Sequence, residues 1–180
     1  MYKNTPEKFG RISVSIHWIS AIVIFTLFGV GFWMVDLNYY SEWYRTAPHY
    51  HKSVGILLLL LTIFRVVWKF VSPNPEIIAN NALERRAAHA GHLALYLVLF
   101  VILVSGYLIS TADGRGIDVF NWFTVPSLGE LFNDQEDIAG LVHEYMAYAL
   151  KALVALHILA ALKHHFFNKD NTLKRMLTFK

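Results

Sequence analysis

Residues 138–162 read IAGLVHEYMAYALKALVALHILAAL, and this stretch decides the fold class. It is long and apolar enough to cross roughly 30 Å of hydrocarbon as an α-helix rising about 1.5 Å per residue. Two histidines, His143 and His157, interrupt it. Ionisable side chains are costly inside a bilayer and usually functional, so these histidines are the informative residues of the stretch.

Three more stretches of the chain have the same character, at about residues 12–35, 53–71 and 87–109. The whole chain of 180 residues is 56% hydrophobic and only 16% charged, which is more typical of a membrane protein than of a soluble domain. We therefore expect an all-α integral membrane protein, a four-helix bundle forming one domain over residues 1–180. The acidic and aromatic connection at 110–137 is expected to hold a short interfacial helix.

The distribution of charge predicts the orientation. With four spans, both termini and the connection at 72–86 lie on one side, and that side carries most of the cations: Lys3, Lys8, Arg11, Arg65, Lys69, Arg85, Arg86 and the basic tail after Leu162. The positive-inside rule then places both termini in the cytoplasm. A net charge of +3 would also be compatible with nucleic acid, but this asymmetry indicates a lipid bilayer as the partner and no nucleic acid.

The histidines form two pairs by depth. His143 and His157 are 14 residues apart, so they share a helix face and lie roughly 21 Å apart along the axis. His17 lies about as far from the cytoplasmic end as His157, and His51 lies level with His143. Each haem iron takes one axial ligand from either side, so the pairs His17–His157 and His51–His143 predict two bis-histidine haems. The chain has no cysteine, which excludes iron–sulfur clusters and covalent c-type attachment.

The same 14-residue step recurs on the other predicted helices. It leads from His17 to Gly31, and a glycine at that depth lets the backbone approach a porphyrin edge. The step from His92 leads to Gly106, and Gly55 follows His51 by one turn. From His51 it leads to Arg65, a buried cation for which a haem propionate is the expected anion.

Other interpretations remain open for these residues. A lone histidine in a membrane can simply hydrogen-bond a neighbouring helix. Zinc is the main competing metal, although neither pair supplies three or four close ligands. His49 is a rival to His51, and we prefer His51 because His49 is expected in a loop after Pro48. Lys151 lies in the middle of its helix, and the sequence assigns it no single role.

With these residues in view, the chain resembles the bacterial cytochrome b561 family over nearly its full length. The resemblance is carried by SIHW with His17, HKSVG with His51, AHAGHL with His89 and His92, and the stretch from His143 to HHFFNKDNTLKRM. It extends to the dihaem membrane subunits of hydrogenases and formate dehydrogenases. In that wider family the ligands come from helices one, two and four, which matches the four histidines of the two pairs. The resemblance implies a multi-pass protein of the bacterial inner membrane.

The resemblance also implies substrates. Some family members are similar to superoxide oxidases, which pass electrons from periplasmic superoxide through the haems to ubiquinone. It implies a quinone pocket near the cytoplasmic boundary, where imidazoles could donate to carbonyls and relay protons. The residues gathered at that boundary are His89, His92, His164 and His165. On the periplasmic side Lys52 and Arg115 could attract superoxide, and they could equally neutralise propionates. Arg115, in DGRG, matches an arginine-bearing loop of the family.

Two functional classes follow. The first is an oxidoreductase that takes electrons from superoxide, or another periplasmic reductant, to a quinone. The second is a non-catalytic electron-transfer subunit that anchors a redox protein partner to the quinone pool.

Overall fold

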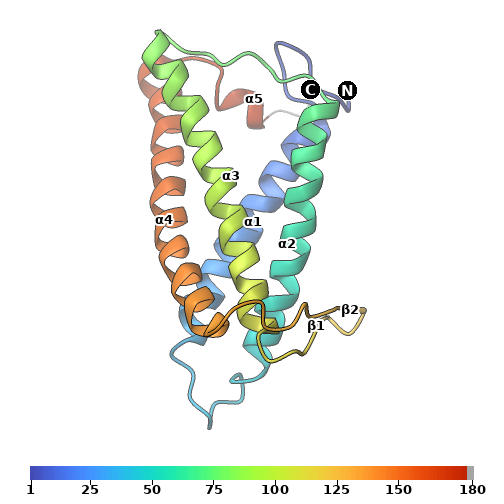
Figure 1. Ribbon diagram of the computed structural model, residues 1–180. Helices are drawn as coiled ribbons and strands as arrows, with labels where there is room; N and C mark the ends of the chain where they lie inside the picture. Colours follow the sequence, from blue (N-terminus) through green and yellow to red (C-terminus); the bar gives the residue numbers. More distant parts are fainter. Residues whose placement is uncertain (178–180) are drawn as a thin grey trace. The chain divides into compact units, whose positions relative to one another are not determined.

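Four long helices make up most of the chain in a computed structural model that describes residues 1–177 (Figure 1). Their bounds are α1 Arg11–Met34, α2 Thr46–Val71, α3 Ala82–Thr111 and α4 Gln135–Lys163. A π-helix, His164–Asn168, continues α4, and a short helix α5, Lys174–Leu177, follows. Two three-residue strands, β1 Ile117–Val119 and β2 Phe123–Val125, lie between α3 and α4.

All four long helices are long and apolar enough to cross a membrane, which confirms the four predicted spans. Large apolar side chains nevertheless point outward: Ile22 is 64% exposed, Leu93 60% and Leu159 60%. A water-soluble protein rarely exposes apolar surface on this scale, whereas lipid solvates it at no cost. The bundle arrangement and the cytoplasmic side of the termini remain predictions.

The helices begin earlier than the hydropathy indicated. Helix α2 starts at Thr46 rather than near residue 53, so the expectation that His49 lies in a loop is wrong. Pro48 falls in the first turn, where its missing N–H breaks no helical hydrogen bond. Helices α3 and α4 begin at Ala82 and Gln135, ahead of the expected 87 and 138. The reason is common to all three: hydropathy marks the part of a helix inside hydrocarbon, and polar first turns extend beyond it.

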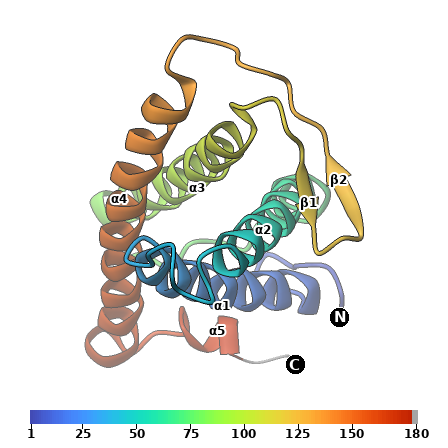
Figure 2. The ribbon, with the colours of Figure 1, turned by 90° about the horizontal axis from the view of Figure 1, so that it is seen from below.

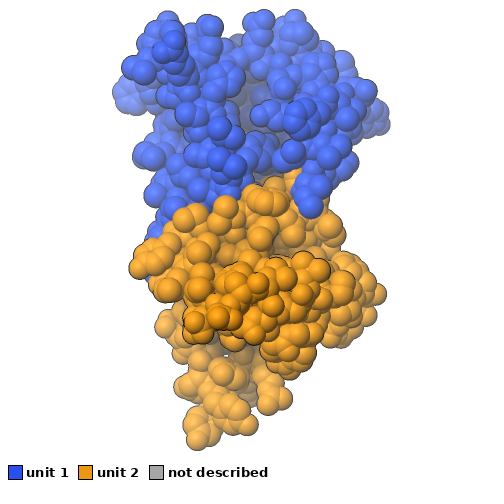
Figure 3. Space-filling view, viewed as in Figure 1, with its two compact units in different colours: residues 1–19, 63–99, 148–180 blue, residues 20–62, 100–147 orange. Residues whose placement is uncertain are grey.

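The chain divides into two compact units, each containing a section of every long helix (Figure 3). Unit 1 comprises Met1–Ile19, Ile63–Leu99 and Tyr148–Lys180. Unit 2 comprises Ser20–Thr62 and Phe100–Ala147. The expectation of a single domain stays a prediction.

In unit 2 the connection after α3 forms a β-hairpin and not the interfacial helix expected from the sequence (Figure 2). Asn121 has a φ of 60°, which suits a tight turn between the two strands. The hairpin is fixed to α2 by Ser53, whose buried hydroxyl donates to the Asp118 carbonyl (3.2 Å) and accepts from the Phe120 amide (3.1 Å). β-Branched and aromatic residues favour strands here, with Ile117 and Val119 packed against Ile56.

In unit 1 both ends of the chain contact the segment after α2. The Asn4 amide N–H donates to the Ser72 hydroxyl (3.0 Å), and the Asn4 side chain donates to the Pro73 carbonyl (2.9 Å). Arg175 donates to the Glu76 carbonyl at 2.9 Å. The N-terminal segment, the connection after α2 and the C-terminal tail thus lie together in one unit, as four membrane spans require.

Candidate functional site

One histidine pair lies within unit 2. The rings of His51 on α2 and His143 on α4 have centroids 6.3 Å apart. The Nδ1 of His143 lies 2.9 Å from the carbonyl of Ile102 and 3.2 Å from the hydroxyl of Ser105. Donation from Nδ1–H to a carbonyl leaves Nε2 as the free, basic nitrogen, which is the state a metal ligand needs. The Nδ1 of His51 is buried without a partner among the described residues.

Two glycines lie against these rings. A Cβ atom on Gly31 of α1 would lie 3.3 Å from Cε1 of His51, and one on Gly106 of α3 would lie 3.0 Å from Cε1 of His143. Both distances are tighter than ordinary contact, so only glycine leaves each imidazole its position. The 14-residue spacing therefore identified two glycines that lie directly beside the candidate ligands His51 and His143. A Cβ on Gly55, by contrast, would meet nothing within 4 Å.

The other pair lies within unit 1. The rings of His17 on α1 and His157 on α4 have centroids 6.2 Å apart. His92 on α3 also contacts His157, with centroids 5.7 Å apart. His157 thus has two imidazole neighbours, one from α1 and one from α3.

Two cations accompany the unit 1 pair. A guanidinium nitrogen of Arg65 lies 3.3 Å from Nδ1 of His17, and the guanidinium lies 5.3 Å from the centroid of the Tyr96 ring. One turn along α2, the ammonium of Lys69 lies 5.5 Å from the same centroid. Among residues 1–177 neither cation forms an ion pair with a carboxylate. The face of the Tyr96 ring thus offsets part of the positive charge of Arg65 and Lys69.

Both pairs fit a haem iron. With a metal–nitrogen distance of about 2.0–2.1 Å, two imidazoles on opposite sides of one metal have centroids roughly 6.3 Å apart. The observed separations are 6.2 and 6.3 Å. The buried, unpartnered Nδ1 of His51 and the glycines beside its pair add to this fit. In the described part of the chain, no three or more His, Cys, Asp or Glu residues group as a metal site of their own.

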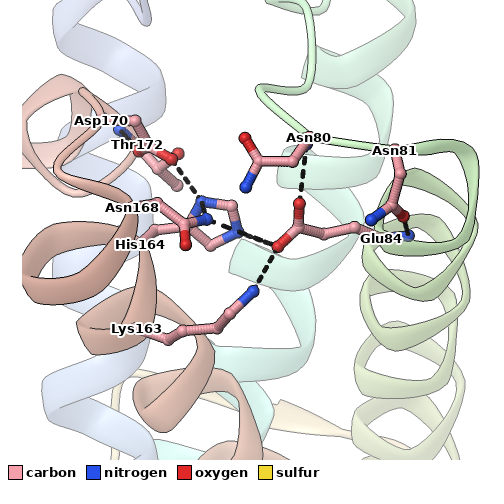
Figure 4. Close-up of polar contacts among 8 residues, drawn as sticks. All are labelled: Asn80, Asn81, Glu84, Lys163, His164, Asn168, Asp170 and Thr172. Carbon is pink, nitrogen blue, oxygen red and sulfur yellow. Dashed lines mark hydrogen bonds and ion pairs between the residues drawn. The ribbon is translucent and has the colours of Figure 1, made fainter.

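The other histidines that were predicted at the cytoplasmic boundary do not form one cluster. His164 lies between two carboxylates, with Nδ1 2.5 Å from Asp170 and Nε2 3.6 Å from Glu84 (Figure 4). Glu84 also forms an ion pair with Lys163 at 2.5 Å. His164 therefore fastens the π-helix to α3, whereas His92 contacts His157. Burial raises the pKa of Asp170, but the hydrogen bonds from His164 and Thr172 outweigh it and hold that pKa below its usual value.

On the other predicted face, Arg115 is paired and not free. Its guanidinium contacts Asp113 at 2.5 Å, and its side chain is 85% exposed. The hydrogen bonds from Arg115, helped by the charge of Lys52, hold the pKa of Asp113 below its usual value. The positive charge that Lys52 and Arg115 offer an anion is thus partly cancelled by this carboxylate.

Sequence reasoning missed several contacts. Ser105 and the Ile102 carbonyl were not assigned, although both lie within one turn of Gly106 on the predicted stripe. Lys69 follows Arg65 by one helical turn, and Tyr96 follows His92 by one, so helical spacing could have found both. Lys151 contacts the ring of Tyr148 at 5.1 Å.

A helical membrane protein whose half-buried histidines pair at the spacing of axial ligands belongs to the class of membrane cytochromes b. The comparisons agree: a family model for prokaryotic cytochrome b561 matches residues 8–179. The chain belongs to that family, whose members carry b-type haem and transfer electrons in the bacterial inner membrane.

Three curated relatives cover almost the whole chain. "Cytochrome b561 homolog 2" of Escherichia coli (strain K12) is 51% identical over 98% of this chain and 94% of its own length. "Probable superoxide oxidase CybB" of Yersinia pestis is 27% identical over 95% of this chain and 96% of its own. "Cytochrome b561 homolog 1" of Escherichia coli (strain K12) is 25% identical over 95% and 97%.

Proposed function

We propose that this protein holds two b haems and carries electrons from periplasmic superoxide to ubiquinone. The observation that carries the proposal is the presence of two separate imidazole pairs, one in each unit, at centroid distances of 6.2 and 6.3 Å. His17 and His157 would hold one haem, and His51 and His143 the other. Each haem would supply a one-electron iron couple when bound.

The overall reaction balances simply. Two superoxide anions are oxidised to two molecules of dioxygen, and the two electrons with two protons reduce one ubiquinone to ubiquinol. The relative named as a probable superoxide oxidase supports the donor, at 27% identity. Lys52 and Arg115 are the cations proposed to attract superoxide, with Asp113 reducing their effect.

His92 is the residue best placed to serve the quinone. Its ring lies against that of His157, so a quinone carbonyl hydrogen-bonded to His92 would lie close to one haem ligand. His89, one turn earlier on α3, would be the next group toward water and could pass on protons. His164 is a weaker candidate because two carboxylates already engage its ring.

Haem content of ligand variants tests the pairing. In a pyridine haemochrome assay the purified wild type should contain two b haems per chain. His17→Ala and His157→Ala should each remove the same haem, and His51→Ala and His143→Ala the other. His49→Ala is the matched control, since its ring contacts only Tyr50 among the described aromatic residues, and should keep both haems. A common loss in His17→Ala and His143→Ala would overturn the pairing.

Superoxide kinetics test the reaction. Haem reduction should outpace spontaneous dismutation, vanish when superoxide dismutase is added, and be followed by reoxidation on adding ubiquinone. His92→Ala should leave haem reduction fast and slow the reoxidation. If superoxide does not reduce the haems, the chain serves instead as an anchor subunit, and a redox protein partner becomes the donor to identify.

A further inference from the structure

The two histidine pairs differ in their electrostatic surroundings. In unit 1, Arg65 lies 3.3 Å from Nδ1 of His17, and its charge also acts on His157 and His92. Lys69, one turn further along α2, shares the face of Tyr96 with Arg65 and acts on His92. Two positive charges without a carboxylate partner among the described residues thus accompany this pair.

The pair in unit 2 has neutral hydrogen-bond partners instead. His143 meets the carbonyl of Ile102 at 2.9 Å and the hydroxyl of Ser105 at 3.2 Å. The Nδ1 of His51 has no hydrogen-bond partner among the described residues. An imidazole that donates its Nδ1–H to a carbonyl is a more basic ligand, which favours the more electron-poor oxidised iron.

Both differences make the reduction potential of the haem in unit 1 higher than that of the haem in unit 2. Reduction adds one electron to a haem, so nearby positive charge favours the reduced state, whereas a more basic ligand favours the oxidised state. At an effective dielectric constant of about 20, a unit charge within roughly 12 Å changes such an equilibrium at least tenfold. A propionate paired with Arg65 or Lys69 would reduce this effect without reversing it.

We infer that Arg65 and Lys69 set the potential of the His17–His157 haem above that of the His51–His143 haem, and so make electron flow toward the quinone side favourable. The inference rests on the proposed function for the two ligand pairs. In this inference Arg65 and Lys69 act through their charge on the reduction potential of the His17–His157 haem, and neither residue is a ligand of the iron.

Spectroscopic redox titration of the purified full-length protein, with haem content measured in parallel, tests the inference. Arg65→Gln should lower the higher of the two midpoint potentials by about 59 mV or more, which is a tenfold change for a one-electron couple. Lys69→Gln should lower the same potential by less, because its side chain is exposed and solvent screens its charge. The lower potential should stay unchanged. Arg86→Gln is the matched control, because it removes an exposed positive charge in the same unit from a residue that, unlike Lys69, has no contact with the Tyr96 ring among the described residues, and it should shift neither potential. Arg65→Lys should retain most of the wild-type value.

The haems are assigned in the His51→Ala background, which should retain only the higher-potential haem. Loss of the higher-potential haem in that background, or unchanged potentials in both glutamine variants with two haems retained, would overturn the inference and leave the dihaem function standing. A wild type with fewer than two haems would overturn the proposed function itself. If Arg65→Gln lowers the haem content, the midpoint potential of Lys69→Gln tests the inference instead, because Lys69 does not contact His17.

Discussion

Substituting alanine for Gly106 tests whether the unit 2 pair holds an iron. The added Cβ would lie 3.0 Å from Cε1 and 3.3 Å from Nδ1 of His143, where ordinary contact begins at 3.4 Å. The ring must therefore move by about 0.4 Å (3.4 − 3.0). Its hydrogen bond to the Ile102 carbonyl at 2.9 Å resists that movement.

The magnitudes favour loss of the cofactor over gain in helix stability. Metal–imidazole distances tolerate only about ±0.2 Å. Disturbing an outer contact of a ligating histidine typically costs about 10–100-fold in metal affinity, or roughly 1.4–2.7 kcal/mol. Alanine in place of glycine within a helix gains only about 0.8–1 kcal/mol. We therefore expect Gly106→Ala to weaken haem binding in unit 2 while the helix itself remains stable.

The assay is haem content per purified chain, measured against a matched substitution on the same helix. A Cβ on Gly91 of α3 would meet nothing within 4 Å, so Gly91→Ala should keep two haems and gain slightly in thermal stability. Gly106→Ala should fall toward one haem. Two haems with unchanged spectra in Gly106→Ala would refute the reasoning, because the imidazole would then not be held where the structure has it.

Three further predictions concern polar contacts. Asp113→Asn removes the carboxylate that pairs with Arg115, so haem reduction by superoxide should be faster than in the wild type at low salt. The difference should disappear at high salt, because salt screens the charge, and stopped-flow kinetics at the two salt concentrations measure it. Since Arg115 depresses the pKa of Asp113, this ion pair persists from neutral pH down to that lowered value, so titration of Asp113 should not change the wild-type rate between neutral and mildly acidic pH. Glu84→Gln should lower the melting temperature slightly, and less at high salt, because its ion pair with Lys163 is half exposed. Ser53→Ala removes two hydrogen bonds to the hairpin, worth about 1 kcal/mol each, so amide exchange in the hairpin should quicken while exchange in the middle of α3 stays unchanged.

The membrane spans and the histidine pairs were accessible from sequence because both depend on local properties. The mean hydropathy over the length of one helix locates a membrane span. The helix face on which a histidine lies, together with its distance from the helix end, predicts that His51 lies near His143 and His17 near His157. Contact between the rings agrees with the predicted depths. Their role as ligands remains a prediction.

The polar contacts outside the spans were not accessible in the same way. His164 meets Glu84, a residue of another helix far away in sequence, and no helical spacing relates the two. The π-helix after Lys163 further changes which way His164 points, since it adds a residue to the turn. The hairpin was missed because three-residue strands are too short for a clear alternation, and Phe120 has a φ of 47° that bulky residues seldom adopt.

The hydrogen bonds between Ser53 and the hairpin also connect His51 to a residue that prefers the membrane surface. Trp122, in the hairpin turn, is 72% exposed, and indole rings prefer the boundary between headgroups and acyl chains. Ser53 connects that turn to α2 only two residues beyond His51. We therefore expect an indole anchored at the membrane surface to fix, through Ser53, the distance between that surface and His51.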